Sequence, residues 1–342
     1  MGSDKKPTVT PVRDLVVGDC DATVVVKVLE PDLKKTSRGS DYVQFVGQDS
    51  SGTIAFKVWE PRRAKGGGYQ EHKDLQAGRI VQCDVRNIQD FNGQRQVKTF
   101  TYDIIEEGDP RYAECAAQVR VGPTDAELDE YMGHIEQMLA RIKHAGLRRA
   151  TQAFLESNRE QFRKCPASPH RDGHHGYEGG MLKHTCDVMR LAMFHAKMVG
   201  KKFASMDVVL AGAFLHDVGK FETYGLKLDR TTAGRLLGHV AIGLTAVSRL
   251  MEEYGVDGDT SVMVQHVVVS HHGTREYGSP EKPQTIEAEI VCWADMADSK
   301  AESVRMKLEG GLEPGKFVGN PKYGMHTAYL PPGAATTAPE EK

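Results

Sequence analysis

Paired cysteines are what this sequence most clearly lacks. Its six cysteines are scattered, and no two of them stand in a C-x-x-C spacing. This pattern argues against a zinc ribbon or a disulfide framework and is typical of free, buried thiols in a reducing compartment. The polar residues 1–10 also lack the apolar core of a signal peptide, and no apolar run reaches the ~20 residues of a membrane span. We therefore expect a cytoplasmic protein with no part in a membrane.

An excess of positive charge is missing as well. The formal net charge is −3, so no global positive field attracts the chain to nucleic acid, and such binding must depend on a local patch. An internal repeat is absent too. The remaining composition is ordinary for a globular protein, with 39% hydrophobic and 27% charged residues. The length of 342 residues is enough for two domains of roughly 100–200 residues each.

The N-terminal part has the pattern of strands and turns. β-Branched and alternating runs predict five strands, at 22–29, 42–46, 53–59, 80–88 and 96–104. A turn sequence at 49–52 joins the second strand to the third, and Asn92-Gly93 joins the last two because it tolerates positive φ at both positions. We therefore expect a multidomain chain whose N-terminal domain, 10–107, is an all-β OB-fold barrel, a fold that binds oligonucleotides on one face.

Strand alternation assigns a candidate nucleic-acid face to this barrel. Lys57 and Trp59 share the face opposite to the apolar one, and Arg62 follows just beyond. Phe100 and Tyr102 lie on the side that carries a further lysine. An exposed ring beside a cation is typical of single-strand binders, because any base can stack on a ring while phosphate pairs with Lys or Arg. The alternative is that these aromatic residues cover the barrel ends or pack on the second domain.

Beyond the barrel the pattern becomes helical. Thr124 is a candidate N-cap that begins a capping box, and apolar residues follow it at helical spacing. We place a linker at 108–122 and an all-α domain at 123–310. The residues from 311 to 342, rich in Pro, Ala and Thr, are expected to form a disordered tail.

Five of the predicted helical stretches carry a polar interruption in an apolar stripe. A lone histidine in such a place is usually a hydrogen-bonded core residue. Five interruptions on successive helices are harder to explain in that way, because each buried polar group costs stability unless it finds a partner. A shared metal centre satisfies all of them at once. The interruptions are His184, the pair His216–Asp217, His239, His271 and Asp295.

These residues divide into two sets of metal ligands. Four side chains can hold one ion: His184, His216, Asp217 and Asp295. The carboxylate of Asp217 has a free oxygen for a second ion, held by His239 and by either His271 or His272, whose helix phases favour the former. Imidazole and carboxylate ligands without thiolates suit Mn²⁺, Fe²⁺ or Zn²⁺, with Mg²⁺ and Co²⁺ also open, and argue against a structural zinc site.

Hydrolysis of a phosphoester is the chemistry that these ligands most readily support. Two ions about 3.5–4 Å apart activate a bridging water and stabilise the leaving oxygen. Lys220 follows His216 by four residues, so it falls on the same side of a helix predicted around 206–220, where it can meet the charge of a bound phosphate. We therefore name Asp217 and Lys220 as the candidate catalytic residues.

The motifs around these residues resemble a known family. Residues 214–220, FLHDVGK, with a histidine upstream and an aspartate downstream, look like the HD superfamily of metal-dependent phosphohydrolases. The sequence is more closely similar to the YhaM-type 3′→5′ exoribonucleases, which pair an N-terminal OB-fold with a C-terminal HD domain. That resemblance covers roughly 165–305 and is architectural only over the β region. Its blocks are HHGYEGGMLKHT at 174–185, LGHV at 237–240, SHHGTREYGSP at 270–280 and ADMADSK at 294–300.

The resemblance implies a metal-dependent 3′→5′ exonuclease that acts on single-stranded RNA, with single-stranded DNA also open and Mn²⁺ as the expected metal. The helical domain would then be an HD phosphohydrolase domain. The histidines before the glycine-rich turn, His175 among them, are candidates for substrate contact or simply exposed loop residues. Lys57, Trp59, Arg62, Lys220 and His272 complete the candidate substrate-binding set.

Two other functions stay open at this point. An HD-type phosphodiesterase for a small or cyclic nucleotide needs only the helical domain, but the enzymes that act on cyclic dinucleotides carry Gly-Tyr-Pro where residues 276–280 read EYGSP. A non-catalytic OB-fold nucleic-acid-binding protein is the other alternative, although a degenerate helical domain usually loses ligands and here each expected position is occupied. The preference for RNA or DNA, the number of ions and the oligomeric state cannot be read from the sequence.

Overall fold

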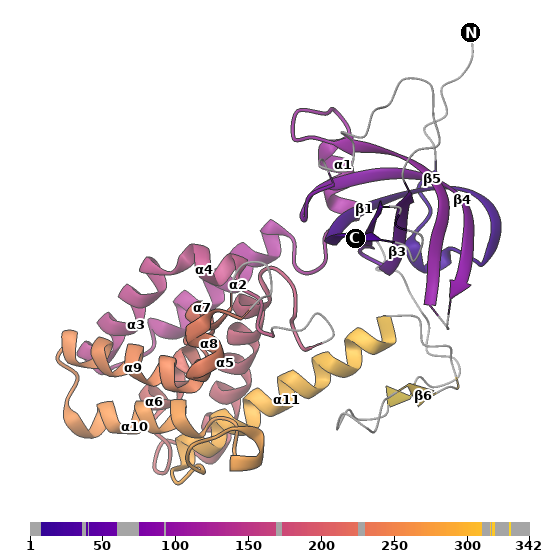
Figure 1. Ribbon diagram of the computed structural model, residues 1–342. Helices are drawn as coiled ribbons and strands as arrows, with labels where there is room; N and C mark the ends of the chain where they lie inside the picture. Colours follow the sequence, from indigo (N-terminus) through magenta and orange to yellow (C-terminus); the bar gives the residue numbers. More distant parts are fainter. Residues whose placement is uncertain are drawn as a thin grey trace. The chain divides into compact units, whose positions relative to one another are not determined.

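The computed structural model divides the chain into two compact units, with the boundary between Val121 and Gly122 (Figure 1). Within the part of the chain that is described, no helix combines the length and the apolar composition that a membrane crossing requires. The described residues are 8–35, 39, 41–59, 75–91, 94–168, 173–224, 230–309, 315, 317–318 and 328–329.

The first unit is a closed barrel of five strands. The strands are β1 (Gly18–Lys35), β2 (Asp41–Asp49), β3 (Gly52–Trp59), β4 (Ile80–Phe91) and β5 (Gln94–Ile105). Their order around the barrel is β1-β2-β3-β5-β4. The pairing of β3 with β5 is parallel and the other pairings are antiparallel. This is an OB-like barrel, so the five predicted strands and the fold class are confirmed.

Aromatic rings fill much of the barrel interior. Phe45 and Phe56 stack with their ring centroids 4.8 Å apart, and Phe100 meets Phe56 edge-on at 5.0 Å. Phe100 and Tyr102 both pack against the buried core, so their assignment to an exposed face was wrong. The reason is an irregular register, because the pairing between β4 and β5 skips Lys98 and thereby turns the residues that follow to the other face.

A short helix packs on the outside of the barrel, in a cluster separate from the aromatic interior. Helix α1 (Tyr112–Gln118) lies within the segment predicted as a linker, and Cys115 packs with Val25 and Ile105 of the barrel. The 3₁₀ helix η1 (Val12–Asp14) also belongs to this unit.

The second unit is helical. Apart from the 3₁₀ turn η3 (Arg275–Tyr277) and a short pair of strands, β6 (Phe317–Val318) and β7 (Ala328–Tyr329), its described elements are α-helices. The helices are α2 (Asp125–Leu139), α3 (Ala145–Ser157), α4 (Arg159–Lys164), α5 (Gly180–Val199), α6 (Met206–Leu215), α7 (Lys220–Thr223), α8 (Thr232–Leu236), α9 (Gly238–Glu253), α10 (Gly258–Ser270) and α11 (Ile286–Glu309).

Helix α6 forms the centre of this unit. Every residue from Val208 to Leu215 is buried, as expected for a helix that is apolar on all sides. Helices α3, α5 and α10 pack around it. Because α6 ends at Leu215, the residues that follow, beginning with His216, lie in the middle of the unit.

Candidate metal centre

The predicted ligands converge where five helices meet. His184 projects from α5, His239 from the first turn of α9 and Asp295 from α11. His216–Asp217 and His271–His272 directly follow the ends of α6 and α10. His184, His216, Asp217 and His271 are almost fully buried, with exposed fractions of 0% or 1%. The helix ends thus gather side chains from residues that are far apart in the sequence.

The first ligand group consists of His184, His216, Asp217 and Asp295. The Nε2 atoms of His184 and His216 lie 3.2 Å apart. Oδ2 of Asp217 lies 3.3 Å from each of these nitrogens, and Oδ1 of Asp295 lies 3.3 Å from Nε2 of His184. The donor atoms of His184, His216 and Asp295 are close enough together to share one cation, and Oδ2 of Asp217 lies beside two of them.

The second ligand group consists of Asp217, His239, His271 and His272. Here Oδ1 of Asp217 lies 3.4 Å from Nε2 of His239 and 3.6 Å from Nε2 of His271. Nε2 of His272 lies 3.2 Å from Nε2 of His239. The structure thus brings both His271 and His272 to this group. The two oxygens of Asp217 face different groups.

Hydrogen bonds to the main chain orient three of the histidines. A carbonyl oxygen can only accept, so the proton of each neutral ring is on Nδ1 and the lone pair on Nε2 points into its ligand group. The donors and acceptors are His216 Nδ1 to Ala213 O at 2.8 Å, His271 Nδ1 to Val268 O at 2.7 Å and His272 Nδ1 to Tyr277 O at 2.8 Å.

Two buried acceptor atoms without a hydrogen-bonding partner indicate that the residues of the centre suit a bound cation. Among the described residues, neither Oδ1 of Asp217 nor Nε2 of His271 has a hydrogen-bonding partner. Leaving a buried polar atom unpaired costs about 1–3 kcal/mol, and a divalent cation would satisfy both lone pairs. Burial also lowers the pKa of His239 to about 3, which keeps its imidazole neutral, as a metal ligand must be.

Lys220 reaches the centre in a different way from the one predicted. Helix α6 ends at Leu215, and α7 begins at Lys220, so Lys220 does not share a helix with His216. Its Nζ donates to Oδ2 of Asp217 at 2.5 Å. Burial works to lower the pKa of Lys220, but the neighbouring carboxylate of Asp217 more than offsets this and raises it. Lys220 is therefore a buried cation beside the shared carboxylate.

The turn before Lys220 depends on a glycine. A Cβ atom on Gly219 would lie 2.0 Å from the main-chain oxygen of His239 and 2.5 Å from the nitrogen of Gly243. Only a residue without a side chain lets the turn lie directly on α9. This close packing is what brings Asp217 to His239.

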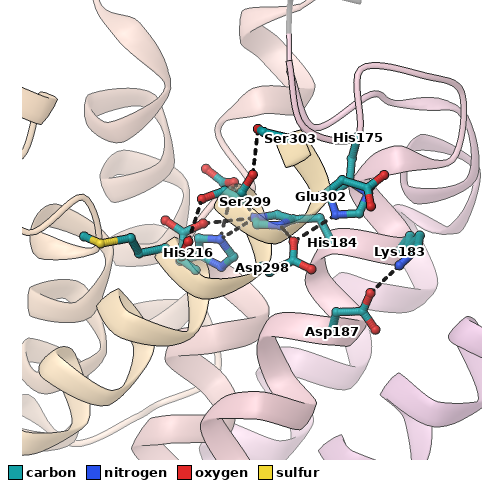
Figure 2. Close-up of polar contacts among 12 residues, drawn as sticks. His175, Lys183, His184, Asp187, His216, Asp298, Ser299, Glu302 and Ser303 are labelled. Carbon is teal, nitrogen blue, oxygen red and sulfur yellow. Dashed lines mark hydrogen bonds and ion pairs between the residues drawn. The ribbon is translucent and has the colours of Figure 1, made fainter. Parts of the chain in front are cut away.

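His175 is buried behind His184 and is not an exposed loop residue. Its exposed fraction is 0%, its Nε2 donates to Oδ2 of Asp298 at 2.8 Å, and its Nδ1 lies 2.8 Å from the hydroxyl of Tyr177. The same oxygen of Asp298 accepts from Nδ1 of His184 at 2.7 Å, as Figure 2 shows. A buried ring with both nitrogens occupied cannot contact substrate, which corrects that assignment for His175. Sequence reasoning missed the role of Asp298, although its position one turn after Asp295 on α11 was a signal.

The barrel carries a separate cluster of a cation and two rings. Nζ of Lys57 on β3 lies 5.6 Å from the ring centroid of Tyr42 on β2 and 5.5 Å from that of Phe91 at the end of β4. Phe91 is 65% exposed. The side chain of Trp59 and the whole of Arg62 lie outside the described residues. Sequence reasoning missed Phe91 because the fourth strand was predicted to end at residue 88, three residues before the end of β4. Tyr42 lay within the predicted strand 42–46 but was not assigned to this face.

Comparisons with known proteins match the helical unit and, in the case of whole relatives, most of the chain. Residues 181–299 match the HD domain family. A protein of Listeria innocua named 3′-5′ exoribonuclease YhaM is 31% identical over 284 residues, which cover 82% of this chain and 85% of that protein. A Bacillus subtilis protein of the same name is 27% identical over 285 residues, with coverages of 82% and 85%. The solved OB domain of Ta0387 from Thermoplasma acidophilum aligns with 30% of this chain and 91% of its own, at a TM-score of 0.23 and 16% identity, a likeness too low to carry an argument.

Proposed function

The chain belongs to the family of the 3′-5′ exoribonuclease YhaM, and on this premise we propose that it hydrolyses single-stranded RNA from the 3′ end in a metal-dependent reaction. One observation carries the chemical part of this proposal. The buried carboxylate of Asp217 directs Oδ2 to the first ligand group and Oδ1 to the second. A carboxylate shared in this way is typical of two-metal hydrolysis of phosphodiesters.

The two ligand groups would each hold one divalent cation, with Mn²⁺ as the proposed metal. Bound there, the pair supplies an activated water and neutralises charge on the scissile phosphate. The residues of the chain do the positioning. Asp217 would be common to both groups, and His271 and His272 would both belong to the second. Lys220 holds Oδ2 of Asp217 by its hydrogen bond and keeps a positive charge beside the place where phosphate would bind.

The barrel is proposed to bind the strand upstream of the cleaved bond. The exposed ring of Phe91 offers a surface on which a base can stack, and Lys57 beside it can pair with a phosphate. Trp59 and Arg62 remain proposed members of this surface. A phosphodiesterase for small nucleotides, or a non-catalytic binding protein, is not favoured, because the match to the exoribonucleases spans 82% of the chain and the ligand set is complete.

A direct assay tests the proposal. Single-stranded RNA labelled at its 5′ end is incubated with the full chain and Mn²⁺, and the products are separated on a sequencing gel beside a matching DNA and a chelator control. We expect a ladder that shortens from the 3′ end and disappears with chelator, and faster shortening of RNA than of DNA. RNA that stays intact with Mn²⁺ present would contradict the proposed activity, whereas equal degradation of DNA would contradict only the preference for RNA.

A further inference from the structure

The two ligand groups differ in the charge that surrounds them. The second group has three imidazoles, and its carboxylate, Asp217, is shared. The first group has the same shared carboxylate and a further one from Asp295. A third carboxylate, Asp298, lies directly behind His184. Lys220 adds one positive charge at Oδ2 of Asp217, but the two carboxylates of Asp295 and Asp298 exceed it, so the first group is the more negative of the two.

Asp298 accepts a hydrogen bond from Nδ1 of His184. Among the ligand histidines whose Nδ1 contact is described, His184 alone has a carboxylate as this partner, whereas His216, His271 and His272 donate to main-chain carbonyls. A carboxylate behind a metal-binding imidazole orients the ring and makes its other nitrogen a stronger donor to the metal. The side chain of Asp298 is only 9% exposed, so solvent screens this charge little.

The local structure holds Asp298 firmly in that position. His175 donates to the same oxygen, and the hydroxyl of Tyr177 lies beside the other nitrogen of His175 and donates to Glu302. His175 takes a left-handed conformation with φ of 50°, a conformation that is uncommon for residues other than glycine.

The loop that carries His175 packs tightly on the start of α5. A Cβ atom on Gly180 would lie only 2.0 Å from the carbonyl oxygen of His175, so only glycine fits there. A strained backbone of this kind persists only where the surroundings determine it, and it is often found at functional sites.

We propose that Asp298, fixed by His175, is a positioning residue that makes the first ligand group the tighter of the two cation sites. The two ions then bind in order, the first group before the second. This inference rests on one part of the proposed function, namely that a cation binds in each of the two ligand groups.

The test measures metal binding and needs no activity. The full chain is freed of metal by chelation and dialysis, and Mn²⁺ is titrated while electron paramagnetic resonance follows the free ion and calorimetry follows the heat. We expect two classes of site, one ion in each. Asp298→Asn preserves the shape and one acceptor oxygen but removes the charge. It should weaken the tighter class about 10–100-fold and leave the weaker class unchanged.

Matched variants assign the two classes. Glu289→Gln makes the same change from carboxylate to amide at an exposed position of α11 and should alter neither class. His272→Ala should remove the weaker class and leave the tighter one. If Asp298→Asn does not fold, His175→Asn takes its place, since asparagine tolerates the left-handed conformation. This change removes the bond from His175 to Asp298 and the contact with Tyr177 but keeps the carboxylate behind His184.

Three results would overturn the inference: equal affinities in the wild-type protein, an unchanged tighter class in Asp298→Asn, or a loss confined to the weaker class. A wild-type protein that binds two ions unequally but leaves RNA intact would instead count against the proposed function alone. The two ideas can therefore fail separately.

Discussion

Replacing Gly219 with alanine should separate the two halves of the metal centre without replacing any ligand side chain. The φ of Gly219 is −63°, which alanine adopts freely, so the change acts through space alone. The new methyl group would meet the main chain of α9 at His239 and Gly243, and a main-chain atom cannot rotate away as a flexible side chain can.

The size of the effect follows from the distances. A Cβ at 2.0 Å from the oxygen of His239 must retreat to about 3.4 Å to reach ordinary contact, so the turn and α9 must separate by about 1.4 Å. Asp217 precedes this turn, and its Oδ1 lies 3.4 Å from Nε2 of His239. Overpacking of this kind costs roughly 1–3 kcal/mol of stability. A misplacement of about 1 Å at a catalytic centre can cost on the order of 100-fold in rate.

Urea unfolding and the rate of RNA degradation would measure the two effects. Gly133→Ala on α2 is the matched control, because nothing lies within 4 Å of its new methyl group. That control should gain roughly 0.5–1 kcal/mol, as alanine does over glycine inside a helix, and should keep full activity. If Gly219→Ala had wild-type stability and kcat/KM, the close packing of the turn on α9 would not be what holds the centre together.

Three further predictions concern the shared carboxylate, the metal and the barrel. Asp217→Asn should abolish hydrolysis while circular dichroism shows an intact fold, because it removes the charge that both groups share, and appreciable turnover by the folded variant would refute the two-site assignment. Mn²⁺ at about 100 times its Kd should raise the free energy of unfolding by about 2.7 kcal/mol in thermal denaturation, and an unchanged midpoint would argue against metal binding by the folded centre. Lys57→Ala/Phe91→Ala should weaken binding of long single strands by about 1–3 kcal/mol per lost stacking contact and leave cleavage of dinucleotides unchanged, whereas equal losses on both would contradict a division of labour between the units.

The elements of both units could be predicted because their patterns are local. Alternating runs mark the strands, although the predicted turn Asn92-Gly93 lies outside the described residues. The capping box at Thr124 marks the start of α2, where Thr124 and Glu127 bond reciprocally. The ligand residues could be found for a related reason, since a polar side chain within an apolar stripe stands out without knowledge of its partners.

Helix phase failed where the helices end. Lys220 was placed beside His216 by counting along one helix, but α6 ends at Leu215 and the chain turns before α7. Counting along a helix also favoured His271 over His272 as a ligand. Helix α10 ends at Ser270, so helical spacing no longer places the two rings on different faces, and both reach the second ligand group. A periodicity argument holds only as far as the helix extends.

Other features depend on contacts that no local pattern carries. His175 meets Asp298 across 123 positions of sequence, and the tight packing at Gly180 that buries it is a tertiary effect. The shift of Phe100 into the barrel core arises from skipped pairing at Lys98, which alternation alone does not reveal.

The most direct test of the central claim is a crystallographic experiment at the manganese absorption edge. Crystals of the full chain grown with Mn²⁺ should show two anomalous peaks, one bounded by His184, His216 and Asp295 and the other by His239, His271 and His272, with Asp217 between them. A single peak, or two peaks that do not share Asp217, would contradict the account.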